Sequence, residues 1–184
     1  TSATIKGSGT LTNQGTVSLN GGTVAAALAN AGTLRVQNGQ TGTVNGALTN
    51  TGTVTVTSAA NAGSSSLTVA NGFSNDGLIE LINGSSGFTS TLNMGAGTTL
   101  TNALGATLRS SGAHPTVANT LNAQVSNLGT LDVVRPLNVT NTPARTFDSS
   151  AGTLDIAAGN TLTVNGGTTR IGGATGFGTG TGTL

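Results

Sequence analysis

The chain has 184 residues, of which 6% are charged and 2% aromatic, and its six basic and five acidic residues leave a net charge of +1. This balance argues against nucleic acid and anionic membrane surfaces as partners, because both require clustered Lys and Arg. The absence of cysteine excludes disulfides and thiolate metal sites, and no apolar run approaches the roughly 18 residues that a membrane span needs.

A nine-residue phrase recurs along the chain in a constant order. It begins as "LTNQGTVSL" at 11–19, and copies of the pattern apolar-x-Asn-x-Gly-x-apolar-x-apolar follow at 28–36, 48–56, 73–81 and 125–133. Two looser copies start at Leu100 and Phe147, and in the second Ser149 replaces the Asn. Because the phrase is constant and its spacing is not, we expect constant strands joined by loops of variable length.

Each copy predicts three elements in chain order. Leu11 and its equivalents lie on a short strand, and the following Asn-x-Gly is a turn, because both residue types tolerate positive φ at small cost. Val17 and Leu19 then alternate with polar neighbours, as in a strand with one buried face. A third apolar patch, such as Val24 or Val44, precedes the next copy.

Three short strands and three bends per repeat describe one coil of a parallel β-helix. About seven to eight coils would make residues 1–184 a single all-β solenoid body. Antiparallel hairpins are the main alternative, because the hairpin signal Asn-Gly occurs six times. A meander would reverse at every turn, however, whereas the phrase keeps one order. Residues 25–31 have helical propensity, but they are in phase with the repeat and are expected as strand and turn.

Stacked coils would place equivalent side chains in columns about 4.8 Å apart. The Asn residues of the phrase would then form a buried ladder, in which each amide donates to the next and accepts from the previous one. The expected ladder is Asn13, Asn30, Asn50, Asn75, Asn102 and Asn127, and the turn glycines are Gly15, Gly32, Gly52, Gly77, Gly129 and Gly152. These roles are structural rather than catalytic.

A single coil buries too little apolar surface to fold alone, so the repeats form an array whose ends need capping. The strand-like Thr4-Ile5-Lys6 and the final "GFGTGTGTL" carry no recognisable cap. We therefore expect a segment of a longer array or a subunit that associates end to end.

Charged residues occupy the outward position of the strand after the turn. Arg109 and Asp132, with Glu80, would form a surface salt-bridge ladder worth about 0–1 kcal/mol per pair. Alternatively, Asp132 and Asp155, one rung apart, would serve as paired acids of a glycosidase or as calcium ligands. The absence of Trp and Tyr disfavours a sugar site.

Longer loops gather after Leu108, where all three prolines lie. His114, the only histidine, is on one of them. Loops on a rigid scaffold often carry recognition, so we take this flank as the candidate binding surface for a glycan or a cell-surface receptor. Its residues are Arg109, His114, Asp132, Arg135, Arg145 and Asp155.

No catalytic residue, metal site or cofactor is predicted, because the glycine-rich segments lack a nucleotide-binding pattern. Thr53, Thr55 and Thr57 would point outward together, as in ice-binding solenoids.

The Leu-x-Asn-x-Gly-Thr-Leu/Val-x-Val phrase resembles the β-helical passengers of bacterial autotransporters and of filamentous-haemagglutinin-like two-partner secretion exoproteins. The resemblance implies a right-handed β-helix, secreted or held at the cell surface, that serves as a stalk, adhesin or filament building block. It transfers no catalytic residue. We therefore expect a non-catalytic, extracellular structural or adhesive solenoid. The alternatives are a polysaccharide-binding or -cleaving β-helix, such as a phage tail spike or glycan lyase, and, more remotely, an ice-binding solenoid.

Overall fold

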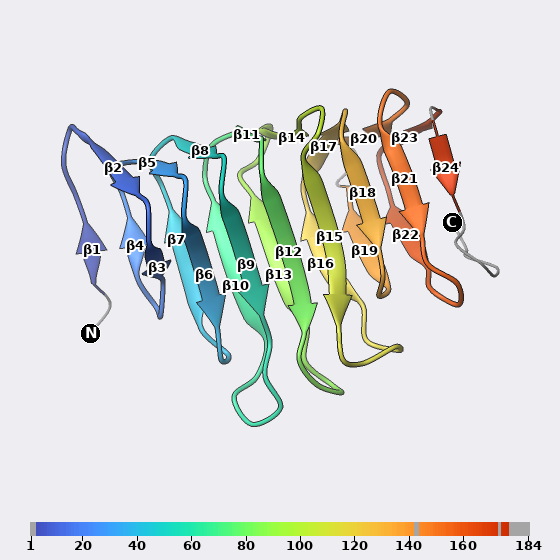
Figure 1. Ribbon diagram of the computed structural model, residues 1–184, viewed down its shortest axis with the longest axis horizontal. Coiled ribbons are helices and arrows are strands. Elements are labelled where there is room, and N and C mark those ends of the chain that lie inside the picture. Colours follow the sequence, from blue (N-terminus) through green and yellow to red (C-terminus); the bar gives the residue numbers. More distant parts are fainter. Residues whose placement is uncertain (1–2, 142–143, 173, 177–184) are drawn as a thin grey trace.

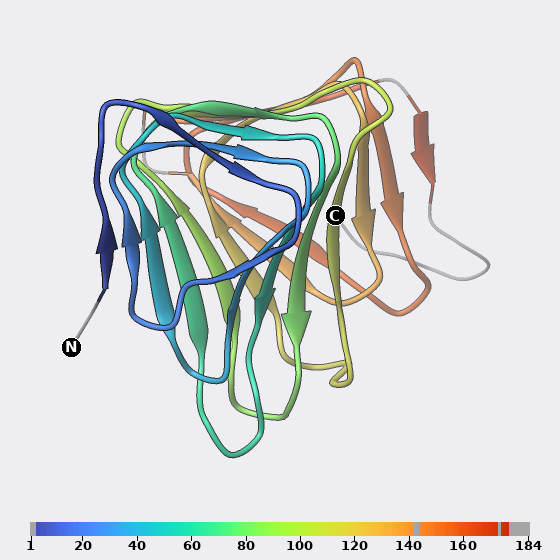
Figure 2. The same cartoon turned by 60° about the vertical axis from the view of Figure 1, so that its left-hand side comes forward.

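The chain winds into a three-sided parallel β-solenoid of about seven turns, with three strands in each coil. The structure is a computed structural model and describes residues 3–141, 144–172 and 174–176. Each coil contributes one strand to each of three eight-stranded sheets, here called sheets A, B and C. Figure 2 shows the three sheets enclosing the core. The predicted fold is confirmed, and the antiparallel alternative is wrong for these sheets.

The strands are short and recur in the order A, B, C along the chain. Sheet A contains β1 (Thr4–Ile5), β4 (Thr23–Val24), β7 (Thr41–Val44), β10 (Ser65–Val69), β13 (Ser90–Met94), β16 (Asn119–Asn122), β19 (Leu137–Thr140) and β22 (Leu162–Asn165). Sheet B contains β2 (Thr10–Asn13), β5 (Ala27–Asn30), β8 (Leu48–Asn50), β11 (Phe73–Asn75), β14 (Thr99–Asn102), β17 (Gln124–Asn127), β20 (Thr146–Ser149) and β23 (Thr168–Ile171). Sheet C contains β3 (Thr16–Ser18), β6 (Thr33–Gln37), β9 (Thr53–Thr57), β12 (Leu78–Asn83), β15 (Thr107–Gly112), β18 (Thr130–Val133), β21 (Thr153–Ile156) and β24 (Ala174–Gly176).

The strand register places residues of the same type opposite one another in successive coils. Asn13 is opposite Asn30, and Leu11 is opposite Leu28. The helix-prone residues 25–31 contribute β5, because Leu28 and Asn30 continue the columns of the coil before them. In the part of the chain that the structure describes, no helix is long and apolar enough to cross a membrane.

The three corners of the coil differ in how much the length of the connecting turn varies from coil to coil. The turn from sheet B to sheet C has two residues in most coils, as at 14–15 and 51–52. The connections from sheet C to sheet A vary more, and the longest are 58–64, 84–89 and 113–118. The loop between β9 and β10 protrudes at the lower edge of Figure 1. The phrase is nearly constant because it spans the corner that varies least, and its two looser copies coincide with the longer turns at 103–106 and 150–152.

The core is a single continuous cluster of aliphatic columns along the solenoid axis. On sheet C, Leu34, Val54, Ile79, Leu108, Leu131 and Leu154 are all buried and lie in register. Exposure rises at the two terminal coils, where Ile5 is 42% and Ile171 36% exposed. Burial thus comes from the neighbouring coils on both sides.

We predict that Leu92→Ala lowers the free energy of unfolding by about 2–5 kcal/mol, because it leaves a cavity in a packed column. Leu92 is fully buried between Leu67 and Leu121. The control is Leu104→Ala, at a leucine that is 88% exposed. Urea unfolding of both variants checks this, and equal losses would contradict the assigned core.

Candidate functional site

A column of buried side-chain amides runs along the corner between sheets B and C. Each Asn at the end of a sheet B strand donates a hydrogen bond from Nδ2 to Oδ1 of the Asn in the next coil. The Nδ2–Oδ1 distances are 2.6 Å for Asn13–Asn30, Asn30–Asn50 and Asn50–Asn75, and 2.8 Å for Asn75–Asn102 and Asn102–Asn127. All six side chains are buried, so the predicted asparagine ladder is present.

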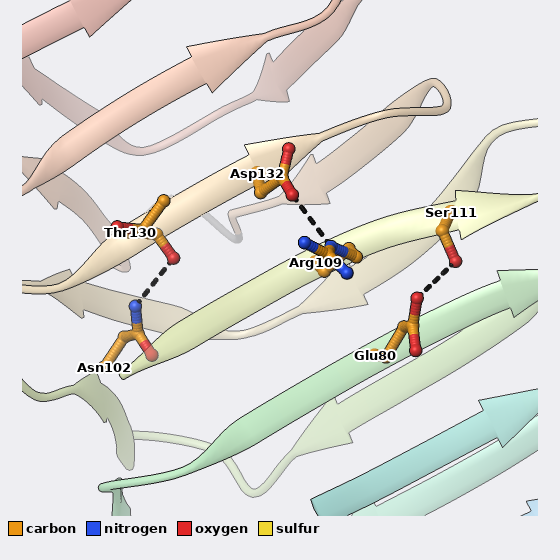
Figure 3. A network of polar contacts seen from close by, with 6 residues as sticks. All are labelled: Glu80, Asn102, Arg109, Ser111, Thr130 and Asp132. Carbon is orange, nitrogen blue, oxygen red and sulfur yellow. Dashed lines mark hydrogen bonds and ion pairs between the residues drawn. The ribbon is translucent and has the colours of Figure 1, made fainter. Parts of the chain in front are cut away.

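The second amide hydrogen of each Asn binds the backbone of the next coil. Asn30 Nδ2 donates to the Thr53 carbonyl oxygen at 2.9 Å, and Asn102 Nδ2 donates to that of Thr130 at 3.0 Å, as Figure 3 shows for Asn102. The other four rungs repeat this contact with Thr33, Leu78, Thr107 and Thr153. Each amide therefore fixes both the ladder and the start of the next sheet C strand.

The ladder ends at a hydroxyl. Asn127 Nδ2 donates to Ser149 Oγ at 2.9 Å, and Ser149 is fully buried. In the next coil the register partner of Ser149 is Ile171, which has no hydrogen-bonding side chain. The change from Asn to Ser in the seventh copy thus marks the last polar rung of the column.

The turn glycines are required by close contact between coils rather than by backbone conformation. None of the six has a positive φ, so the expectation that the turn exploits positive φ is wrong. A Cβ added to Gly32, Gly52 or Gly77 would instead overlap the backbone oxygen of the glycine in the preceding coil. The small residue is needed because the two-residue turns stack directly on one another.

A second buried polar cluster lies at the corner between sheets C and A, outside the repeated phrase, and was not predicted from it. Asn119 Nδ2 donates to the Leu81 carbonyl oxygen at 2.8 Å and to Ser110 Oγ at 3.0 Å. Asn83 Oδ1 accepts from the backbone N–H of His114 at 3.0 Å. Ser110 occupies a position that is aliphatic in the neighbouring coils. Ser65 and Ser90 occupy the equivalent place in the two preceding coils and donate from Oγ to the carbonyl oxygens of Thr57 and Ile82, both at 2.7 Å, as Asn119 donates to that of Ser111. The signal in the sequence is a small polar residue at the start of three successive sheet A strands.

The charged residues of sheet C lie on its outer face and are only partly paired (Figure 3). Arg109 Nε donates to Asp132 Oδ2 at 2.7 Å, with side-chain exposures of 42% and 18%. Glu80 is in register with Arg109, but its carboxylate accepts from Ser111 Oγ at 2.7 Å. Asp155 is the register partner of Asp132. The ladder is therefore one ion pair with an acidic rung on either side.

The other residues of the candidate flank lie at two different corners. His114 is in the loop after β15, and Arg135 Nε donates to the Gly112 carbonyl oxygen at 2.9 Å, so both belong to the corner between sheets C and A. Arg145 precedes β20 at the corner between sheets A and B and donates to the Met94 carbonyl oxygen at 3.0 Å. The structure thus brings Arg109, Asp132 and Asp155 together but does not join Arg145 to them.

Sheet B carries one further charged pair. The Ser150 hydroxyl and then the Ser150 backbone N–H donate to the Asp148 carboxylate, and these bonds, with Arg170 nearby, hold the pKa of Asp148 below its ordinary value. The Arg170 Nη1–Asp148 Oδ2 distance is 3.5 Å. Among the residues that the structure describes, no group of three or more His, Asp or Glu is placed to hold a metal ion, and no pocket is present.

Comparisons of this chain with protein-family models, with curated proteins and with solved structures gave no match.

We predict that Gly52→Ala lowers the free energy of unfolding by about 1–3 kcal/mol or more, because the added methyl group overpacks the contact between turns. The matched control is Gly15→Ala, at the same turn position of the first coil, where an added Cβ meets nothing within 4 Å. Thermal and urea unfolding of both variants checks this. Similar stability of the two variants would show that close stacking does not explain the glycines.

Proposed function

We propose that this chain is a non-catalytic, extracellular β-solenoid that serves as a stalk, adhesin or filament building block. The observation that carries the proposal is the unbroken ladder from Asn13 to Ser149, which links seven successive coils through buried hydrogen bonds. Buried, fully paired amides favour one register over all others, because any slip would leave polar groups unpaired. A solenoid with a single register is a rigid rod of defined length and cross-section, as a stalk or filament requires.

The terminal coil supports end-to-end association. Strands β1, β2 and β3 each pair with one neighbouring strand in the described residues, and Ile5 is partly exposed beside them. An unpaired strand edge is a template for another parallel strand. We propose that a further coil, from the same chain or from a second copy, stacks on this edge.

The outer face of sheet C supports the adhesive part of the proposal. Arg109, Asp132 and Asp155 form a compact charged patch, and His114 and Arg135 lie at its neighbouring corner. Glycans and receptor surfaces are recognised by such mixed donors and acceptors on a rigid scaffold. Sheet C would therefore face the partner.

Electron microscopy of the purified protein, together with antibody labelling of intact producing cells, tests this function. We expect elongated rods of uniform width and labelling without permeabilisation. Compact particles, or labelling only after the cells are opened, would contradict the proposal.

The polysaccharide-cleaving alternative makes a separate prediction about the acidic rungs. If the two carboxylates are structural, Asp132→Asn combined with Asp155→Asn changes neither polysaccharide cleavage nor calcium-dependent melting, and stability shifts by about 0–1 kcal/mol per lost pair. Loss of a cleavage activity with the fold retained, as judged by circular dichroism, would establish the enzymatic alternative instead.

A further inference from the structure

The outer face of sheet A is a regular array of hydroxyl and amide groups. Its outward side chains form two columns along the axis, which we call the hydroxyl–amide face. The first column is Thr4, Thr23, Thr43, Thr68, Asn93 and Asn122, and the second is Thr41, Ser66, Thr91, Thr120, Asn138 and Thr163. The two columns overlap on β7, β10, β13 and β16, so the array repeats in two dimensions over these four rungs.

The face differs from the other two sheets in charge. Sheet C carries Arg35, Glu80, Arg109, Asp132 and Asp155 on its outer side, and sheet B carries Asp148 and Arg170. The eight strands of sheet A contain no charged and no aromatic residue. Nothing in the stacking of coils requires this difference, since all three sheets share the same parallel register.

The spacing and rigidity of the array follow from the sheet. Neighbouring rungs lie about 4.8 Å apart, and the two positions of one rung lie about 6.6 Å apart along the strand. Threonine is branched at Cβ and has a restricted χ1, and the inward neighbours Leu67 and Leu92 are fully buried. The hydroxyls are therefore held in place before any partner arrives.

Some hydroxyl groups of the array are free to form hydrogen bonds with a partner. Asn93 Nδ2 donates to Ser66 Oγ at 2.9 Å and Asn122 Nδ2 donates to Asn93 Oδ1 at 2.7 Å, which orients these amides along the axis. Within the part of the chain that the structure describes, the hydroxyls of Thr43, Thr68 and Thr91 make no hydrogen bond to another protein group. Those hydroxyls remain available to water.

We propose that the hydroxyl–amide face binds ice. A single exposed hydroxyl contributes little to binding, because it exchanges one hydrogen bond with water for another. A partner must therefore engage many rungs at once, and a rigid array lowers the ordering cost of doing so. Ice presents oxygen atoms that repeat in two dimensions at comparable intervals. A sugar polymer is less favoured, because the face has no aromatic platform.

Of the threonines suspected from the sequence, Thr53 continues a short column from Thr16 and Thr33, but Leu78 interrupts that column in the next coil. Thr55 on sheet C lies in register between Arg35 and Glu80, so its column is interrupted by charge on both sides. On sheet A the two columns lie side by side and contain only hydroxyl and amide side chains. The hydroxyl–amide face carries no charge, unlike the charged patch on sheet C. Ice binding by sheet A does not depend on the adhesive role proposed for sheet C.

Ice-affinity partitioning and thermal hysteresis of the full chain test the proposal. We expect the chain to enter slowly growing ice and to produce hysteresis, and the double variant Thr68→Lys/Thr91→Lys to fall to the level of a buffer blank. The matched control is Thr55→Lys/Thr107→Lys, which places the same changes on outward positions of sheet C and retains the activity. Circular dichroism melting confirms that each variant is folded.

If the lysine pair prevents folding, Thr68→Tyr/Thr91→Tyr replaces it, because tyrosine suits a strand and its ring would stand above the face. The proposal is overturned if the unmodified chain neither partitions into ice nor produces hysteresis. It is also overturned if the sheet C control loses activity equally. Binding of the unmodified chain to crystalline cellulose or chitin, without ice activity, would assign the face to a polysaccharide instead.

Discussion

A buried asparagine amide in this ladder is fully hydrogen-bonded only when another coil lies at the spacing of a parallel sheet. Without the neighbouring coils, Asn50 and Asn75 would keep only the contacts to the glycine of their own turn and would lose the amide partners on either side. Each buried donor or acceptor left unpaired costs about 1–3 kcal/mol. With the neighbouring coils, the Nδ2–Oδ1 distances are 2.6–2.8 Å and the second hydrogen reaches the next sheet C strand. The same group that penalises an isolated coil therefore stabilises the stack, and the fold is cooperative along its axis.

The rest of the coil follows from that constraint. A ladder with this spacing requires that the turns after each Asn approach closely, and Gly52 and Gly77 provide the space. The aliphatic columns then fall into register without a separate specification. The corner between sheets C and A lies away from the ladder and tolerates loops of different lengths. Variation is concentrated there, and the outer faces are free to differ in charge and chemistry.

The repeated phrase made the parallel strands, the ladder and the inward aliphatic residues predictable, because stacking requires equivalent residues in equivalent places. Non-repeating features escaped prediction for the same reason. The buried polar column of Ser65, Ser90 and Asn119 spans only three coils and changes residue type along the axis, so it does not recur with the phrase. Glu80 was expected to pair with Arg109 but binds Ser111, a choice of rotamer that register does not determine. The glycines were predicted at the right positions for the wrong reason, since steric contact between coils is invisible in a single repeat.

A double-mutant cycle on adjacent rungs tests the ladder most directly. Asn50→Ala and Asn75→Ala are measured singly and together by urea unfolding, beside the pair Asn30→Ala and Asn102→Ala, which are not hydrogen-bonded to each other. The account predicts a coupling energy of about 0.5–3 kcal/mol for the adjacent pair and additivity within about 0.5 kcal/mol for the separated pair. Additive losses at the adjacent pair would contradict the central claim that each amide is stabilised by the next.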